Sequence, residues 1–161
     1  MPLAPMVATA ALLAAALGPA AAPVVAPGAG PAAADSGGQS AGGYARGAFQ
    51  ATNHQRAERD LVRLDRSGCL QRKAVKQARK MAKRGEIFHQ DLHSVLEDCE
   101  LSSAGENVAS GFPTGRATVN RGWMRSAGHR ANILRADYRL MGLAARKADG
   151  VWYVAQVFGK H

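Results

Sequence analysis

The stretch GWMRSAGHRANIL, residues 122–134, brings a tryptophan, a serine, a histidine, an arginine and an asparagine close together. Residues three and four apart share one face of a helix, so His129 lies beside Asn132. Gly128 weakens a continuous helix, and the Ser126 hydroxyl is suited to cap a second helical piece. The pattern predicts two short helices with His129 near the start of the second, facing a cavity. Spacing alone also allows a half-buried helix whose histidine is only hydrogen-bonded.

Two amphipathic helices are expected before this stretch. Apolar residues recur at helical spacing over residues 51–62 and 70–84, and Gly85 ends the second pattern. The second helix carries a stripe of positive charge opposite its apolar face, which is typical of a solvated surface. Its members are Arg72, Lys73, Lys76, Arg79, Lys80, Lys83 and Arg84. Residues 87–100 are expected to be loop-like, and residues 102–109 are expected to be a loop that enters a short helix.

The residues after the opening stretch change from helical to strand periodicity. Two β-type runs, residues 140–145 and 151–158, flank Ala148-Asp149-Gly150, which is a hairpin turn signal. Helices first and strands last, without a repeated strand-helix-strand unit, predict an α+β fold. In such a fold an antiparallel sheet is covered by helices.

The first residues have the composition of an export segment. Residues 1–34 contain an apolar run, a Gly-Pro break and a small-residue cleavage pattern, so we expect a signal peptide and a secreted protein. The apolar run falls short of the roughly 20 residues that span a bilayer. Residues 35–47 are rich in Gly and Ser and are expected to form a flexible lead-in. One domain, residues 48–161, remains.

The net charge of +9 allows an acidic partner such as an anionic polymer, a membrane surface or a nucleic acid. A basic surface that only keeps a small protein soluble explains the same charge. Nucleic acid is not expected, because the chain has no lysine run, no zinc-finger spacing and no interleaving of aromatic and basic residues.

Cys69 and Cys99 are the only cysteines in the chain. An even number of cysteines in an exported chain favours a disulfide, and two buried thiols are the alternative. The two residues lack CxxC spacing and lie too far apart in sequence to look like a metal pair.

Several short motifs follow one another along the chain. They are IFH (87–89), GENVA (105–109), WMRSAGHRANIL (123–134), Gly142 and WYVAQVFGK (152–160), preceded by an NxxR pattern at Asn53 and Arg56. Residues 48–161 thereby resemble the bacterial branch of the CAP superfamily of cysteine-rich secretory, antigen 5 and pathogenesis-related proteins, also called SCP-like extracellular domains. The resemblance implies a three-layer α-β-α sandwich with a mostly antiparallel central sheet, ending in the β-hairpin.

The resemblance also implies a central cleft lined by two histidines and two glutamates, which bind a divalent metal in some members. The matching positions here are His89, Glu106 and His129, whereas Ser126 occupies the position of the other glutamate. Two imidazoles and a carboxylate are the ligand set of an open zinc site, and calcium is the other candidate metal. The same three residues can instead form a metal-free cluster in which Glu106 orients a histidine.

Other residues of the motifs are expected to support this cleft. Asn107, Asn132 and Ser126 are expected to line the cleft and contact its ligand beside His89, Glu106 and His129. The amides of Asn107 and Asn132, with the Arg130 guanidinium, also suit them to hold the cleft loops. Ser126, His129 and Glu106 can be drawn as a catalytic triad, but the chain lacks a GxSxG elbow and Ser126 is as easily a helix cap. The aromatic residues Trp123, Trp152, Tyr153 and Phe158 are expected in the core.

Two functions remain as hypotheses. The favoured one is a secreted, monomeric binding or interaction module whose ligand is a lipid, a cell-wall polymer or another protein. The alternative is a metal-dependent extracellular hydrolase of peptides or cell-wall polymers, in which Glu106 or a metal-bound water moves protons. The sequence supplies no unambiguous nucleophile or base, which favours the module and leaves enzymatic activity open.

Overall fold

The structure of the protein is a computed structural model that describes residues 39–161. The expected signal peptide, residues 1–34, and the first part of the expected lead-in lie outside the described residues. Within residues 39–161 no helix combines the length and the apolar composition needed to cross a membrane.

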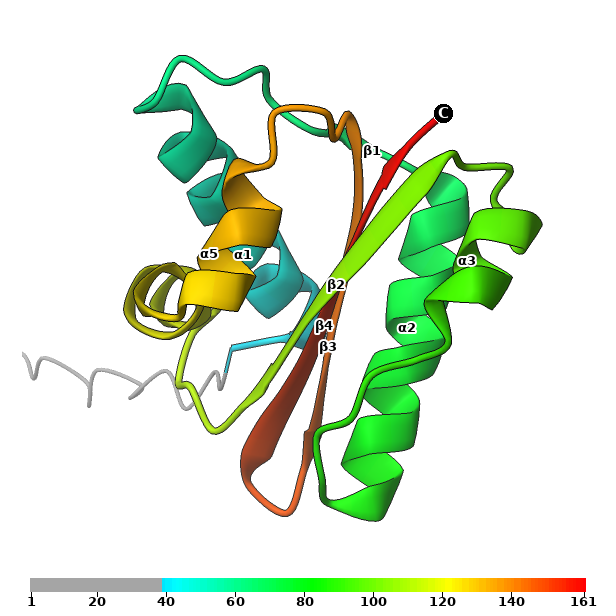
Figure 1. The fold of residues 1–161 in the computed structure, drawn as a ribbon. Helices are drawn as coiled ribbons and strands as arrows, with labels where there is room; N and C mark the ends of the chain where they lie inside the picture. Colours follow the sequence, from blue (N-terminus) through cyan, green and yellow to red (C-terminus); the bar gives the residue numbers. More distant parts are fainter. Residues whose placement is uncertain (1–38) are drawn as a thin grey trace, which may run out of the picture. The chain divides into compact units, whose positions relative to one another are not determined.

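A four-stranded sheet forms the centre of the fold (Figure 1). Its strands are β1 (Asp65–Arg66), β2 (Ser103–Ser110), β3 (Leu140–Ala148) and β4 (Val151–Lys160), in the spatial order β1-β3-β4-β2. β4 pairs antiparallel with both β2 and β3, and the short β1 pairs parallel with β3. The sheet is mostly antiparallel, as expected, and β2 lies at one of its edges.

The connection between β3 and β4 is a tight hairpin. Asp149 and Gly150 have φ angles of 48° and 79°. Positive φ at both central residues is the requirement of a type I′ turn, whose twist matches that of the flanking strands. The expected C-terminal hairpin is confirmed.

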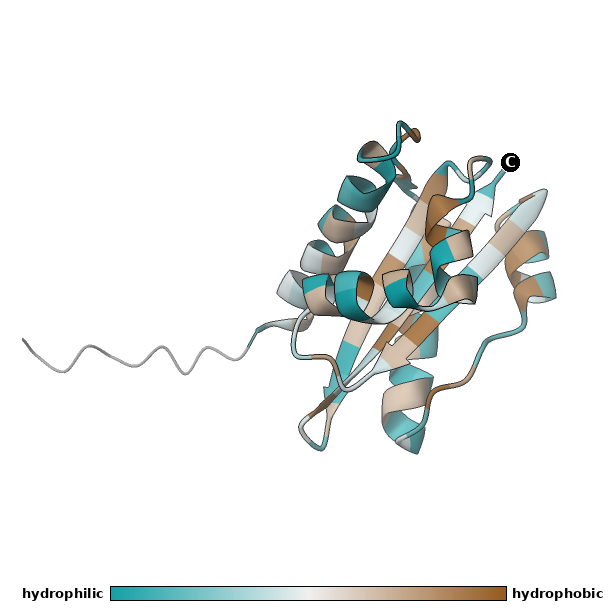
Figure 2. Ribbon diagram, turned by 60° about the vertical axis from the view of Figure 1, so that its left-hand side comes forward, coloured by the Kyte–Doolittle hydropathy of each residue, from teal (hydrophilic) through white to brown (hydrophobic). Residues whose placement is uncertain are grey.

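Helices cover both faces of the sheet (Figure 1). One face carries α1 (Ala41–Ala57), α4 (Gly115–Ala117), η1 (Thr118–Gly122), η2 (Trp123–Arg125) and α5 (Ala127–Leu134). The other carries α2 (Gly68–Arg84) and α3 (Leu92–Asp98). Alternate residues of β4 enter the two cores, with Val154 in the α1–α5 core and Ala155 in the α2–α3 core. The three-layer α-β-α sandwich is confirmed, and Figure 2 shows the hydrophobic segments of the strands between the helical layers.

The first helix corrects two expectations. It begins at Ala41 and ends at Ala57, rather than spanning about 51–62. Residues 41–47, expected to be flexible, are helical. The Ser40 side chain accepts a hydrogen bond from the backbone N–H of Gly43, and Tyr44 is fully buried with its hydroxyl bonded to Thr118. The burial of Tyr44 therefore outweighs the low helix propensity of the Gly-rich segment around it.

The NxxR pattern holds α1 to the rest of the domain. Asn53 makes two hydrogen bonds to the backbone of Leu64, at 3.0 and 2.8 Å. Arg56 is 0% exposed, and its guanidinium donates to the carbonyl oxygens of Val62, Ile133, Arg135 and Tyr138. Burial, and then the charge of Arg139, lower the pKa of Arg56. The pattern is a structural clamp between α1, α5 and the segment that leads into β3.

Two loop expectations are wrong. Residues 102–109 are expected as a loop that enters a helix, but residues 103–110 form β2 and pair with β4 along their whole length. The segment SAGENVAS is poor in β-branched residues, so pairing with β4 rather than strand propensity determines its conformation. Residues 87–100 contain α3, which the Asp91 side chain caps by accepting from the backbone N–H of His93.

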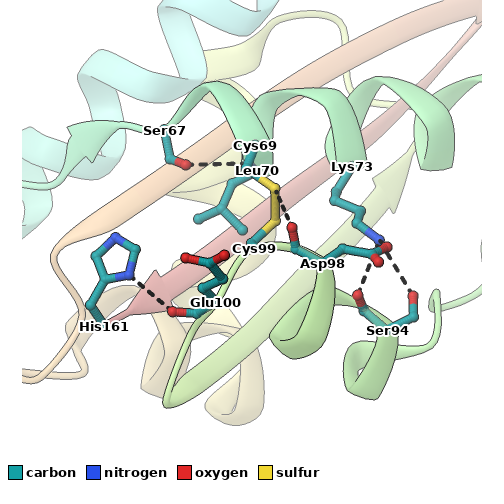
Figure 3. The surroundings of a disulfide bond; sticks show 9 residues. All are labelled: Ser67, Cys69, Leu70, Lys73, Ser94, Asp98, Cys99, Glu100 and His161. Carbon is teal, nitrogen blue, oxygen red and sulfur yellow. Dashed lines mark hydrogen bonds and ion pairs between the residues drawn. A yellow bond between two sulfur atoms is a disulfide. The ribbon is translucent and has the colours of Figure 1, made fainter.

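A disulfide joins Cys69 near the start of α2 to Cys99 at the end of α3, with a Cα–Cα distance of 5.7 Å (Figure 3). This confirms the expected pairing. One turn along α2, Lys73 forms an ion pair with Asp98 and bonds the backbone carbonyl of Ser94 at 3.2 Å. The hydrogen bond from Lys73, followed by its charge, lowers the pKa of Asp98. The α2–α3 layer is thus tied together by a covalent bond and an ion pair.

Candidate functional site

The candidate site is built on the edge strand β2, whose neighbouring residues point to opposite faces of the sheet. Val108 belongs to the α2–α3 core and Ala109 to the α1–α5 core. The alternation of a strand therefore directs Glu106 toward the α2–α3 layer and Asn107 toward the α5 layer. The GEN motif thus places a side chain on each face of the sheet at its edge.

Glu106 holds the loop between α2 and α3. Its side chain is 0% exposed, and its Oε2 lies 2.8 Å from the Nδ1 of His89 and accepts from the backbone N–H of Gln90 at 3.1 Å. Its Oε1 accepts from the Gln90 side-chain amide at 2.6 Å. A buried carboxylate is stabilised by such donors, since an unpaired charge in the interior is costly. The His89 side chain remains 59% exposed, so the loop presents its imidazole to solvent in a fixed position.

Two asparagines attach α5 to the other face of the sheet edge. The Asn107 amide donates to the backbone carbonyl of His129 at 3.1 Å and to the Gln156 side chain at 3.1 Å. The Asn132 amide donates to the backbone carbonyl of Glu106 at 3.1 Å and to the side-chain oxygen of Asn107 at 3.0 Å. The expected supporting role of both amides agrees with these bonds. Asn107 is fully buried and has no surface to offer a ligand, which corrects its assignment as a ligand-contacting residue.

His129 lies near the start of α5 and is half-buried. Burial, and in second place the charge of His89, lower the pKa of His129 from its ordinary value of 6.5. The electrostatic influence of His89 links the two imidazoles, although they come from opposite layers of the sandwich. Near neutral pH the neutral, hydrogen-bonding form of His129 is therefore favoured.

The expected ligand set of His89, Glu106 and His129 does not form a three-ligand metal centre. Both carboxylate oxygens of Glu106 are bonded to His89 and Gln90. Within residues 39–161, no three His, Cys, Asp or Glu side chains gather in an arrangement that could hold a metal ion. An open zinc site needs three protein ligands with their donor atoms directed at one point. The three residues therefore do not fit the open zinc site that their residue types predicted.

Ser126 corrects a second expectation. It occupies the N-cap position of α5, so the expected break between two helical pieces is confirmed, but its side chain makes no capping hydrogen bond. The drawn triad of Ser126, His129 and Glu106 also fails, because the Glu106 carboxylate bonds His89 and Gln90.

The four core aromatic residues are buried as expected, and the Trp123 indole donates to the carbonyl of Val108 at 3.1 Å.

Two residues of the site were not anticipated from the sequence. Gln90 supplies two of the donors to Glu106, and its only signal is its position directly after His89. Gln156 is fully buried between Thr52 and Asn107. Its signal is a polar residue inside the otherwise apolar run WYVAQVF, which marks a buried hydrogen-bonding position.

Comparison with known proteins decides the family. The family model described as CAP, cysteine-rich secretory protein family, matches residues 49–158. The chain belongs to this family. The CAP match contains the site residues from both layers, together with the asparagines that join α5 to β2.

Relatives of the CAP domain come from several bacteria. The curated protein YkwD of Bacillus subtilis (strain 168), described as uncharacterized, is 27% identical over an alignment of 124 residues that covers 73% of this chain and 48% of YkwD. The chain thus spans about half the length of this relative. In a solved extracellular protein with an SCP domain from Bacillus anthracis, the TM-score is 0.67 at 23% identity, covering 75% of this chain and 41% of that one. A solved outer surface protein of Borrelia burgdorferi has a TM-score of 0.64 at 21% identity, covering 70% of this chain and 89% of that one.

Proposed function

We propose that this CAP domain is a secreted binding module and that the polar site at the edge of β2 contacts an extracellular ligand. His89 and His129 are the residues that touch the ligand, while Glu106, Asn107 and Asn132 position them. Export is supported by the composition of residues 1–34, and by similarity to proteins described as extracellular or outer surface. The ligand classes that suit such a module are a lipid, a cell-wall polymer or another protein.

The observation that carries the proposal is the environment of Glu106. Its carboxylate is fully buried and accepts hydrogen bonds from one imidazole and from two groups of Gln90. A group that moves protons must reach the substrate directly or through a water. Glu106 is instead surrounded by protein donors, which favours a positioning role and a rigid binding surface. Rigid, prearranged polar groups reduce the ordering cost of binding.

Direct binding measurements test the proposal. Soluble peptidoglycan fragments and phosphatidylcholine vesicles are titrated into the full chain, selectively labelled with ¹⁵N-histidine, and the imidazole resonances are followed by NMR. The expected result is saturable binding of one probe, with shifts at His89 and His129 and no change in the probe itself. His89→Asn and His129→Asn are each expected to weaken that binding about tenfold, the loss of one good hydrogen bond to a ligand.

The matched control is His93→Asn. His93 is also an exposed histidine paired with a carboxylate, Glu97, at 3.4 Å, but it lies on α3 outside the site. Its replacement is expected to leave the affinity unchanged. Equal losses in all three variants, or no shift at His89 and His129 with any probe, contradict the proposal. Release of a cleaved product from a probe contradicts it in favour of the hydrolase.

A further inference from the structure

The outward face of α2 carries an unusual concentration of one charge. Between Gly68 and Arg84 the helix holds seven of the 21 Lys and Arg residues of the chain and none of its 12 Asp and Glu residues. Two of the seven are paired, since Lys73 bonds Asp98 and Arg84 lies 4.0 Å from Glu86. Within residues 39–161, the others have no carboxylate within ion-pair distance. They are Arg72, Lys76, Arg79, Lys80 and Lys83, and all five are exposed.

This arrangement is unfavourable for the helix itself. Cations stand four residues apart along one face, as in Arg72 and Lys76, Lys76 and Lys80, and Arg79 and Lys83. Like charges at this spacing destabilise a helix, and α2 carries no Asp or Glu that would offset the repulsion. The stability of the helix therefore does not account for this composition.

The charged residues border an open groove of about 470 Å³. Its lining residues are Gln71, Arg72, Val75, Lys76, Arg79 and Lys80. Val75 is half-buried and supplies an apolar floor, and the cations stand along the groove for about 12 Å at a helical rise of about 1.5 Å per residue. The groove thus fits an elongated anionic chain better than a single small anion.

The buried face of α2 argues against a membrane as the partner. A helix that binds a bilayer inserts large apolar side chains into it. The apolar residues of α2, including Leu70, Ala78 and Met81, are fully buried against the sheet. The exposed large hydrophobic residues of the described part of the chain, Val62 and Ile87, lie outside α2.

Single-stranded nucleic acid is disfavoured for a different reason. Proteins that bind it stack bases on aromatic side chains along a basic groove. Residues 68–84 contain no aromatic residue.

We infer that the α2 groove binds a linear polyol phosphate polymer, whose phosphodiesters are held by Arg72, Lys76, Arg79 and Lys80. Because α2 contains none of the residues of the His89–His129 site, this inference does not depend on the function proposed above.

The test uses the full chain and a fluorescently labelled poly(glycerol phosphate) oligomer, with affinity measured by anisotropy at several salt concentrations. The double variant Lys76→Gln, Lys80→Gln is expected to weaken binding about tenfold or more. It is also expected to reduce the slope of log affinity against log salt by about 0.7 for each phosphate that the variant no longer neutralises. Its melting temperature is expected to stay equal or rise, because repulsion between like charges on the helix is relieved.

The matched control is Lys147→Gln, Lys160→Gln, which removes the same charge from exposed positions on β3 and β4. It is expected to change affinity less than twofold and to keep the salt slope. Equal effects of the two double variants overturn the inference, because they reduce it to an effect of net charge. Tighter binding of phosphatidylglycerol vesicles or of a single-stranded oligonucleotide at equal phosphate concentration also overturns it. Absence of binding to the oligomer at low salt does the same.

Discussion

The Oε2 of Glu106 lies 2.8 Å from the Nδ1 of His89, with the carboxylate fully buried and the imidazole 59% exposed. An ionised carboxylate only accepts hydrogen bonds, so Nδ1 carries the hydrogen of this contact and Nε2 is the ring nitrogen left for a ligand. Carboxylates that orient a histidine in this way fix both its tautomer and its direction. The contact joins β2 to the α2–α3 loop and determines how the site faces solvent.

Replacement of Glu106 by Gln is expected to destabilise the protein. A glutamine amide nitrogen faces one of the donors that now bond the carboxylate, so a buried polar group loses its partner. The expected loss in the free energy of unfolding is about 1–3 kcal/mol, measured by urea denaturation. The hydrogen of the Gln90 backbone N–H, which donates to Glu106 at 3.1 Å, is expected to exchange faster with solvent. Glu97→Gln, at an exposed carboxylate, serves as the control, and equal losses in both variants contradict a special role for Glu106.

The pKa of His129 is expected below 6.5 in a histidine NMR titration, because burial and the charge of His89 both oppose its protonation. The unfolded chain binds this proton more readily than the folded chain does. The stabilisation from neutral His129 is therefore complete above pH 6.5 and is lost as the pH falls below it. His89→Asn is expected to raise the pKa of His129 only in part, because burial is the larger cause. A His129 pKa at or above 6.5 is the contrary result.

Arg56 has a structural role that a lysine cannot fill. Its guanidinium bonds three carbonyls that end α5 and lead into β3, and also the carbonyl of Val62 in the segment after α1. A lysine ammonium cannot bond all four at once. Arg56→Lys is expected to lower the free energy of unfolding by about 2–4 kcal/mol in urea denaturation. Arg59→Lys is the control, because Arg59 is exposed, and is expected to stay within about 0.5 kcal/mol of the wild type. A mild effect of Arg56→Lys would show that the clamp is dispensable.

The disulfide between Cys69 and Cys99 closes a loop with a sequence separation of 30 residues. Cys69→Ser together with Cys99→Ser is expected to lower the free energy of unfolding by about 3–4 kcal/mol through the greater entropy of the open unfolded chain. Thermal unfolding of the wild type with and without a reductant measures the same effect. An unchanged melting temperature in the double variant and in the reduced wild type contradicts it.

Local signals in the sequence were sufficient for the parts of the fold with strong periodicity or turn chemistry. Gly85 has a φ of 71° and ends α2 where the pattern predicts, and Asp149-Gly150 forms the hairpin turn. Local signals were insufficient where long-range packing decides the conformation. Tyr44 gives a Gly-rich segment its helix, and β4 gives SAGENVAS its strand.

The site shows the same division. The family motifs located Glu106 and both histidines, but they did not show that the partner of Glu106 is His89 together with Gln90. Neighbouring residues of an edge strand point to opposite layers. Glu106 therefore points from β2 to the loop that carries His89 and Gln90, whereas Asn107 points to α5, which carries His129.

The most direct test of a metal-free site is a calorimetric zinc titration of the purified protein at neutral pH, beside the His89→Ala, His129→Ala double variant. Because both carboxylate oxygens of Glu106 are hydrogen-bonded to His89 and Gln90, we expect no submicromolar zinc binding. In that range the zinc affinity of the two proteins is expected to be the same. Submicromolar binding by the wild type that disappears in the double variant would contradict this expectation and establish a metal centre at this edge of the sheet.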